Sequence, residues 1–282
     1  VPASRPLSPV VAPAMATSDH ETSCEYWRAQ LHEGILPVLE LPLDLPRPAQ
    51  QTFKGDNVPV ALSAETRASL EALGRTHGCT LYQVMLGLWS LLLCRHAGQE
   101  EVVVGSPYHG RDAAGTERLV GYFVNMLALR VDVPRDGSVA ALLHSARTVA
   151  VDGMHHALVS FQQIVHQLLP HRTHDGSRNA VFQTMMAWEE VGGFDSDADV
   201  FGSSVTVEAI PDGAGVAKVD VTLSARPVEA GGIEGVIEFN TDLFARESIE
   251  RMGRRFTVLA EALAAAPAEA GVWTLPMMPA DE

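Results

Sequence analysis

The feature of this sequence that most restricts its fold is an unbroken apolar run, VMLGLWSLLLC, at Val84–Cys94. This run is too short to cross a bilayer, because a membrane-spanning helix needs about 20 apolar residues. It predicts instead a helix that is buried on all sides. Such a helix must be surrounded by other elements. The 282 residues, 46% of them hydrophobic, are enough for one large domain or two small ones.

Helix signals recur along the chain. Two predicted helices, 64–77 and 81–96, begin after the N-cap residues Ser63 and Thr80, and the first ends at Gly78. Other helices are expected to begin near Ser23, to follow the cap residue Ser138, and to span 161–169 and 247–263.

Apolar and alternating runs between these helices predict strands. The segment 39–50 lies in a region with prolines at 37, 42, 46 and 48, which exclude helix and central strand and predict an extended surface connection. Because strands and helices are interleaved, the fold class is α/β or α+β with a mixed sheet. The predicted strands are 58–62, 101–105, 119–131, 181–188, 205–209, 219–225 and 235–240, with a hairpin turn at 229–232.

Composition excludes several function classes. A formal charge of −15 disfavours nucleic acid as a partner, and no segment indicates a membrane span. Cys24, Cys79 and Cys94 are far apart and predict neither a disulfide framework nor a zinc site, so a reducing cytoplasm is expected. Residues 1–23 are rich in Pro, Ala and Ser and lack a secretory core, so we expect a linker or disordered lead-in there.

Four segments in order resemble the condensation domains of nonribosomal peptide synthetases. Val120–Arg130 is similar to the motif (I/V)GxFVNT(L)xxR, with Met126 in place of Thr. Asp175–Gln183 is similar to DxSRNPLFQ, with Ala180 in place of Pro. The other two are the helix, turn and strand at 80–111 and the closing strands and helix at 218–252. The resemblance implies that 24–282 form one lobe of a fold like chloramphenicol acetyltransferase, with a mixed, mostly antiparallel sheet flanked by helices.

The resemblance also implies where a substrate tunnel lies. In the family, two lobes enclose a tunnel to which carrier proteins deliver substrates on phosphopantetheine arms, so no cofactor is expected to bind this chain directly. The residues expected on the tunnel wall are Ser106, Gly121, Tyr122, Val124, Asn125 and Met126. The residues expected to support these motifs are Arg111, Arg130, His156, Phe161, Asp175, Ser177, Arg178 and Asn179.

The family's catalytic signature, HHxxxDG, belongs to the first lobe and has no full match here. His155-His156 lacks the Asp-Gly and is similar instead to the second lobe's HQDxPFE motif. His171 and Asp175-Gly176 fit HxxxDG by coincidence, because Pro170 stands where the first His is required. We therefore assign no catalytic residue. We also assign no metal site, since the alternating Asp195, Asp197 and Asp199 lack the Glu of a calcium loop.

Two hypotheses follow from the resemblance. In the first, the chain is a naturally truncated, non-catalytic domain that binds a carrier protein or a tailoring enzyme. In the second, it is half of a catalytic condensation domain, and its missing N-terminal lobe supplies the histidines. A freestanding acyltransferase that uses His171 is the least favoured reading. The segment 190–215, acidic and loop-rich, is a weak candidate for a contact with the other lobe or a partner.

Overall fold

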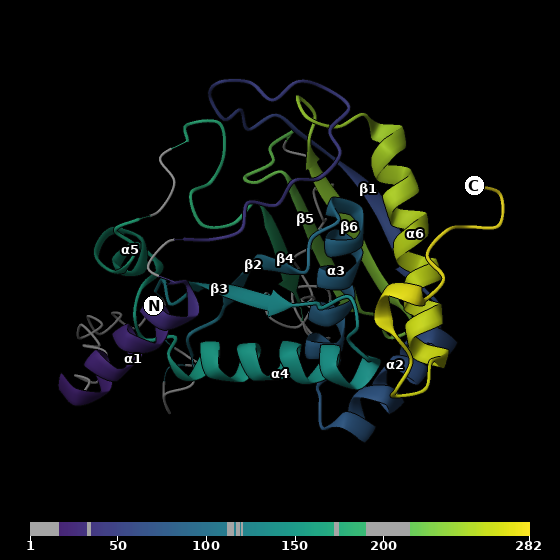
Figure 1. Ribbon diagram of the computed structural model, residues 1–282, viewed down its shortest axis with the longest axis horizontal. Coiled ribbons are helices and arrows are strands. Elements are labelled where there is room, and N and C mark those ends of the chain that lie inside the picture. Colours follow the sequence, from purple (N-terminus) through teal and green to yellow (C-terminus); the bar gives the residue numbers. More distant parts are fainter. Residues whose placement is uncertain are drawn as a thin grey trace, which may run out of the picture.

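The computed structural model describes residues 17–32, 35–111, 116, 119, 121–171, 175–189 and 215–282. Its centre is one six-stranded mixed sheet in the order β1-β6-β5-β4-β2-β3, shown in Figure 1. Strand β4 pairs in parallel with β2 and β5, and the other three pairings are antiparallel. The predicted mixed, mostly antiparallel sheet is therefore confirmed. The strands are β1 (Gly55–Leu62), β2 (Glu101–Tyr108), β3 (Asn125–Asp132), β4 (Thr184–Trp188), β5 (Val221–Pro227) and β6 (Ile233–Asn240).

The helices flank this sheet. Helix α3 (Leu81–Ala97) packs on β2 and β4, and helix α6 (Arg246–Ala265) packs on β1 and β6. Helix α4 (Val139–His155) runs beside the edge strand β3, as Figure 1 shows. The remaining helical elements are α1 (Thr17–Gln30), α2 (Ala64–His77), the short α5 (Phe161–Gln163), the π-helical η2 (Ile164–Leu168) and the 3-10 turn η4 (Val272–Thr274).

Helix α3 is the buried helix that the apolar run predicts. Every residue from Gln83 to Cys94 is buried, and the Trp89 indole donates a hydrogen bond to the Thr184 hydroxyl of β4 at 3.1 Å. A capping box between Thr80 and Gln83 satisfies the first backbone donors of the helix. The core thus forms where α3 lies against the sheet.

Among the described residues, no single helix is both long and apolar enough to cross a membrane. Helices α2 and α3 meet that test only as a pair bent by 103°. Burial of α3 in the core accounts for its apolar composition.

The local helix signals are confirmed. Ser63, Thr80 and Ser138 each cap their helix with the side chain, and Gly78 adopts φ +66°, the left-handed conformation that ends α2. The helix expected from Ser23 instead begins at Thr17.

The predicted strand ends need correction. The run 119–131 forms a strand only from Asn125, whereas the strand 101–105 continues to Tyr108. Pro107 has no backbone N–H to donate to the sheet. It is tolerated because it lies opposite Met126 at a position where the two backbones do not exchange hydrogen bonds: the Met126 N–H bonds to the Asn125 side chain instead of to β2. The predicted strand 205–209 and the acidic segment 190–214 lie outside the described residues.

Candidate functional site

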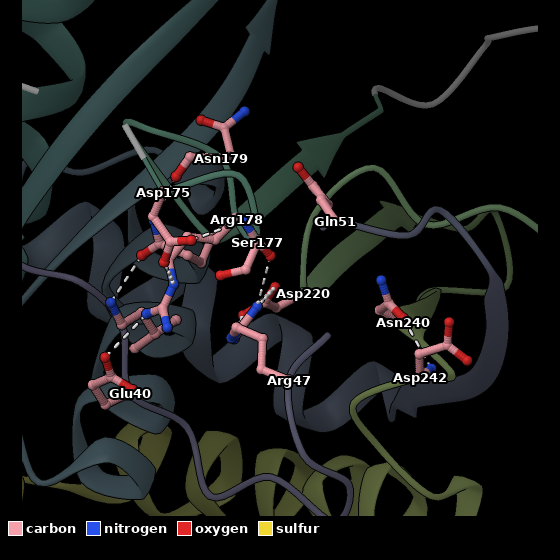
Figure 2. Close-up of polar contacts among 12 residues, drawn as sticks. Glu40, Arg47, Gln51, Asp175, Ser177, Arg178, Asn179, Asp220, Asn240 and Asp242 are labelled. Carbon is pink, nitrogen blue, oxygen red and sulfur yellow. Dashed lines mark hydrogen bonds and ion pairs between the residues drawn. The ribbon is translucent and has the colours of Figure 1, made fainter. Parts of the chain in front are cut away.

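The first polar cluster joins the extended segment 39–53, which we call the strap, to the sheet. Arg47 of the strap forms a bidentate ion pair with Asp220, with 3.0 Å between Nη1 and Oδ1. The Asp220 side chain is buried, at 5% exposure, and the Arg47 side chain is largely covered, at 11%. Arg47 also donates to the Ser177 carbonyl oxygen at 3.4 Å, as Figure 2 shows. The hydrogen bond to Asp220 raises the pKa of the Arg47 guanidinium above its ordinary value, so the guanidinium stays charged.

The Asp175–Asn179 loop packs beside this pair. Hydrogen bonds from Ser177, first from its side chain and then from its backbone N–H, lower the pKa of the Asp175 carboxyl. The backbone N–H donates to Oδ1 at 2.8 Å. Arg178 makes ion pairs with Asp175 and with Glu40 of the strap, both at 3.0 Å (Figure 2). The polar groups of this loop are therefore used to hold the loop and the strap together.

Amide side chains continue the same scaffold. The Asn179 Oδ1 accepts from the backbone N–H of Val181 at 3.0 Å, and Gln183 donates to the Asn179 carbonyl oxygen at 2.9 Å. The Gln183 Oε1 in turn accepts from the Leu39 backbone N–H at 2.8 Å. Asn240, at the end of β6, donates to the Thr52 carbonyl oxygen of the strap at 2.8 Å.

We call this set of contacts the strap cluster; it comprises Glu40, Arg47, Asp175, Ser177, Arg178, Asn179, Asp220 and Asn240. It lies at the amino ends of the parallel strands β4 and β5, because its loop precedes Thr184 and Asp220 precedes Val221. Ligands of open α/β sheets bind at the opposite, carboxyl ends of the strands. Asp175, Ser177, Arg178 and Asn179 therefore lie at the end of the sheet opposite the usual ligand-binding end, and their supporting role stays a prediction.

At the carboxyl ends, β2 and β4 separate. Their pairing covers only Val104 with Thr184 and Gly105 with Met185. Beyond it, the Ser106 hydroxyl donates to the Met186 carbonyl oxygen at 3.0 Å. The Ser106 hydroxyl has a single proton, which it donates to Met186. It therefore acts as the acceptor toward Tyr82, whose hydroxyl donates to it at 2.9 Å.

This position corrects the expectation for Ser106. Its side chain is 2% exposed, so it closes the gap between two strands inside the core rather than lining an open wall.

Asn125, at the start of β3, holds the turn between α4 and α5. Its Nδ2 donates to the carbonyl oxygens of Ala157 at 2.7 Å and Val159 at 2.9 Å. Its Oδ1 accepts from the backbone N–H of Met126 at 2.9 Å and of Phe161 at 3.0 Å. The Asn125 side chain thus makes four internal hydrogen bonds, and its expected polar contact with a substrate stays a prediction.

The segment before β3 is the exposed part of this region. Tyr122 is 90% exposed and Val124 is 43% exposed, whereas Met126 is half-buried against the core. Gly121 is also exposed. Arg111 supports the segment by donating to the Gly121 carbonyl oxygen at 3.4 Å and by lying over the Phe123 ring at 4.2 Å.

Three other predicted supports have internal contacts. Arg130 forms an ion pair with Glu101 on the neighbouring strand β2. The Phe161 ring lies 5.4 Å from the Phe182 ring. His156 contacts helix α1, where its Nδ1 lies 2.9 Å from the Ser23 hydroxyl. Together with Asn125, His156 defines what we call the turn cluster: Asn125, residues 156–161 and the α1 residues that they contact.

The two stretches that partly fit the catalytic signature lie in these two clusters. Within the described ranges, no group of three or more His, Cys, Asp or Glu residues is arranged to hold a metal ion. His155-His156 lies at the end of α4, with His156 stacked on Tyr26 at 4.3 Å between ring centroids. Asp175, which belongs to the partial match to HxxxDG, accepts a hydrogen bond from Ser177 within its own loop.

Sequence reasoning missed Arg47, Asp220 and Tyr82. The signal for the first was an arginine between Pro46 and Pro48 in the strap. The signal for the second was a lone acid between Val219 and Val221 at the start of a strand. A charge in an apolar strand requires a partner, and that partner is distant in sequence.

Comparison with known proteins agrees with this geometry. A family model described as the condensation domain matches residues 13–280. Malpinin synthetase of Mortierella alpina is 38% identical over 231 residues, which are 82% of this chain and 3% of that protein. Bacitracin synthase 3 of Bacillus licheniformis is 33% identical over 239 residues, which are 84% of this chain and 4% of that protein. The chain therefore spans a small part of the curated relatives that it matches.

Solved structures show the same fold. A four-domain nonribosomal peptide synthetase bound to AMP and glycine superposes with a TM-score of 0.81 at 24% identity, covering 94% of this chain and 21% of that one. The X-domain from teicoplanin biosynthesis also gives 0.81, at 20% identity, covering 94% of this chain and 58% of that one. With the matching family model and the relatives above 30% identity, the chain belongs to the condensation domain family of nonribosomal peptide synthetases.

Proposed function

We propose that this chain is the C-terminal lobe of a condensation domain, truncated so that it does not catalyse amide formation alone, and that it serves as a binding platform. Its partner is a carrier protein or a tailoring enzyme that acts on carrier-bound amino acids. The phosphopantetheine arm then belongs to the carrier protein, and this chain binds no cofactor directly. A cytoplasmic location, with its reducing environment, fits the three free cysteines.

The observation that carries the proposal is the use of the motif side chains for internal contacts. Asn125, His156 and Arg178 each bond to other parts of the fold: Asn125 to the Ala157 carbonyl oxygen, His156 through Nδ1 to Ser23, and Arg178 to Asp175. The exposed side chains beside them are apolar instead: Tyr122 at 90% and Leu158 at 68%. Apolar exposure next to a fully bonded motif favours binding over chemistry.

Asn125 brings these apolar side chains into one region. It bonds to the carbonyl oxygens on either side of Leu158, and Val124 immediately precedes it in the chain. We call Tyr122, Val124 and Leu158 the apolar patch. Aromatic and large aliphatic side chains of this kind anchor protein interfaces.

The similarity to X-domains adds support for a tailoring enzyme as the partner. A complex of the X-domain and OxyB from teicoplanin biosynthesis contains a domain that superposes on this chain with a TM-score of 0.79, at 21% identity. That structure is a complex of a related fold, and the partner of this chain remains our proposal.

A binding measurement tests the platform. The purified chain is titrated, by calorimetry, with a phosphopantetheine-loaded carrier protein and with a tailoring enzyme of the same biosynthetic class. We expect one of them to bind, and Tyr122→Ser and Leu158→Ser each to weaken binding about tenfold, as for interface anchors. Phe53→Ser is the matched control, because Phe53 is 55% exposed on the strap. Absence of binding to either protein, or an equal loss in the control, contradicts the platform.

The second candidate is half of a catalytic condensation domain. The extent of the structural match favours this candidate, because the chain corresponds to 55% of the solved first condensation domain of the calcium-dependent antibiotic synthetase. In that case a separately purified lobe with the HHxxxDG motif should bind the chain and restore amide formation between two carrier-bound aminoacyl groups. Amide formation on mixing would establish this candidate in place of the non-catalytic platform.

A further inference from the structure

Two arginines of helix α6 bind the carboxylate of Glu282. The Glu282 Oε1 accepts a hydrogen bond from Arg254 Nη2 at 2.9 Å, and its Oε2 accepts one from Arg255 Nε at 2.8 Å. The Glu282 side chain is largely covered, at 11% exposure. Hydrogen bonds between two charged groups are roughly twice as strong as neutral ones. This acid is therefore held through both of its oxygens.

A surface ion pair elsewhere in the chain has a different form. In the pair of Asp242 with Lys54, one acid meets one base at 3.2 Å and stays 26% exposed. Glu282 instead meets two guanidinium groups, one at each carboxylate oxygen. The planar guanidinium matches the geometry of a carboxylate. Arg254 and Arg255 thus form a site that fits one carboxylate.

The segment 275–282, which we call the tail clip, brings the acid to this site. Figure 1 shows the end of the chain beside α6. A turn, in which the Glu282 N–H donates to the Pro279 carbonyl oxygen at 3.2 Å, directs the Glu282 side chain. At its other end, Arg95 of α3 donates to the Leu275 carbonyl oxygen at 2.6 Å. Arginine side chains therefore hold the tail clip at both ends.

The tail clip is attached in a way that permits exchange. It forms no helix or strand, and Pro276 and Pro279 have no backbone N–H to donate. Met278 is 50% exposed. The site itself faces solvent, because Arg254 is 49% exposed and Arg255 is 23% exposed. A second carboxylate therefore has access to the arginines without a change in α6.

We propose that Arg254 and Arg255 are a binding site for an acidic peptide segment, and that Glu282 fills this site from within the chain. The tail clip then competes with a carboxylate of a partner protein. The ligand class follows from the present occupant, which is a glutamate side chain presented by a tight turn. The site belongs to this chain alone and does not depend on the proposed platform.

The test uses the acetylated and amidated peptide PADE, which copies residues 279–282. Its binding is followed by NMR at the Arg255 Nε–H, with Arg255→Lys for assignment. We expect Glu282→Gln to move this signal and added peptide to return it toward its position in the natural chain. The natural chain should bind the peptide about tenfold more weakly, because its own Glu282 acts at an effective concentration on the order of millimolar.

A variant of the same helix and two variants of the site supply the controls. Glu250 pairs with Arg246 at 3.2 Å on α6, so Glu250→Gln removes a carboxylate without freeing the site and should behave like the natural chain. In the Glu282→Gln background, replacement of Arg254 and Arg255 by Gln should abolish binding, as seen in the signals of the peptide itself. The peptide PADQ should bind none of these proteins.

Several outcomes overturn the proposal. They are an Arg255 signal that Glu282→Gln does not move, equal binding of PADE to this variant and to the natural chain, equal binding of PADQ, and binding that survives loss of both arginines. Inorganic phosphate that binds as well as PADE would also reject a site for peptide carboxylates. The calorimetric test of the platform is independent of each of these results.

Discussion

The strap cluster and the turn cluster both contain residues that resemble family motifs, yet they hold the fold in different ways. The strap cluster is built on charge, with the buried pair of Arg47 and Asp220 at its centre. The turn cluster is built on neutral hydrogen bonds, with the Asn125 amide at its centre. Exposed apolar side chains lie beside the turn cluster at Tyr122 (90%) and Leu158 (68%), and the strap carries less exposed ones at Leu45 (46%) and Phe53 (55%).

This difference shows that similarity to a motif does not by itself locate a site. The Asp175–Asn179 loop lies at the amino ends of β4 and β5, where it fixes the strap. Asn125 pairs with Tyr108 at the carboxyl end of β2, and so lies at the end of the sheet where open α/β folds bind ligands. We expect mutations in the strap cluster to affect stability, and mutations near the turn cluster to affect binding as well.

The largest predicted effect comes from breaking the ion pair of the strap cluster. Asp220→Ala leaves the Arg47 guanidinium buried without its partner, which typically costs about 3–5 kcal/mol. Urea denaturation of the variant and the natural chain measures the difference in the free energy of unfolding. The double variant Arg47→Met, Asp220→Leu removes both charges and should recover most of the loss. If the double variant is no more stable than Asp220→Ala, charge is not what distinguishes this cluster.

The next effect tests the neutral cluster. Asn125→Asp removes the two N–H donors and places carboxylate oxygens against the carbonyl oxygens of Ala157 and Val159. We expect a loss of about 3 kcal/mol, because two acceptors lose their donor and face a charge. Thermal unfolding at pH 7 measures it. Unlike Asp220→Ala, this variant should also weaken partner binding through displacement of Leu158; unchanged stability would contradict the role of Asn125 as a clamp.

Sequence predicts the helices better than the sites because helix signals are local. Ser63, Thr80 and Gly78 act on residues within one turn, and each of these predictions is confirmed. Burial depends on residues distant in the chain. Ser106 is enclosed only because β2 meets β4 and Tyr82 reaches it from α3, and a motif carries no information on those contacts.

The same reason explains Asp220 and Arg47, which pair across 173 positions. A single sequence shows an isolated acid and an isolated base, each with many available partners. The fold resemblance is recognisable because four segments occur in order, whereas the roles of single residues depend on geometry that their order does not contain.

An acid titration sharpens the comparison because it measures the contribution to stability of His96, a residue that belongs to neither cluster. Burial, with a smaller contribution from the nearby Arg255 and Arg95, lowers the pKa of His96, at the end of α3, to about 4. In the unfolded chain His96 has the ordinary histidine pKa of about 6.5. Between about pH 6.5 and pH 4 it is therefore protonated in the unfolded chain but neutral in the folded chain. The stability contributed by this group is complete above about pH 6.5 and is lost as the pH falls toward 4, by about 3 kcal/mol.

The variant His96→Phe isolates that contribution. Free energies of unfolding at pH 7.5 and pH 4.5 are compared between the variant and the natural chain, so that the shared titration of carboxylates cancels. The variant should lose less stability on acidification. An equal loss in both proteins would show that His96 is not the group responsible, and that acid sensitivity has to be sought within the two clusters.

The smallest effect on stability, and the sharpest separation of the two regions, is expected at Tyr122. Its side chain is 90% exposed, so Tyr122→Ser should change the free energy of unfolding by less than about 0.5 kcal/mol. Calorimetric titration with the partner should nevertheless show weaker binding. A stable variant with reduced binding separates the surface beside the turn cluster from the scaffold of the strap cluster. A stable variant with unchanged binding shows instead that this exposed ring does not anchor a partner, and the apolar patch then loses its strongest member.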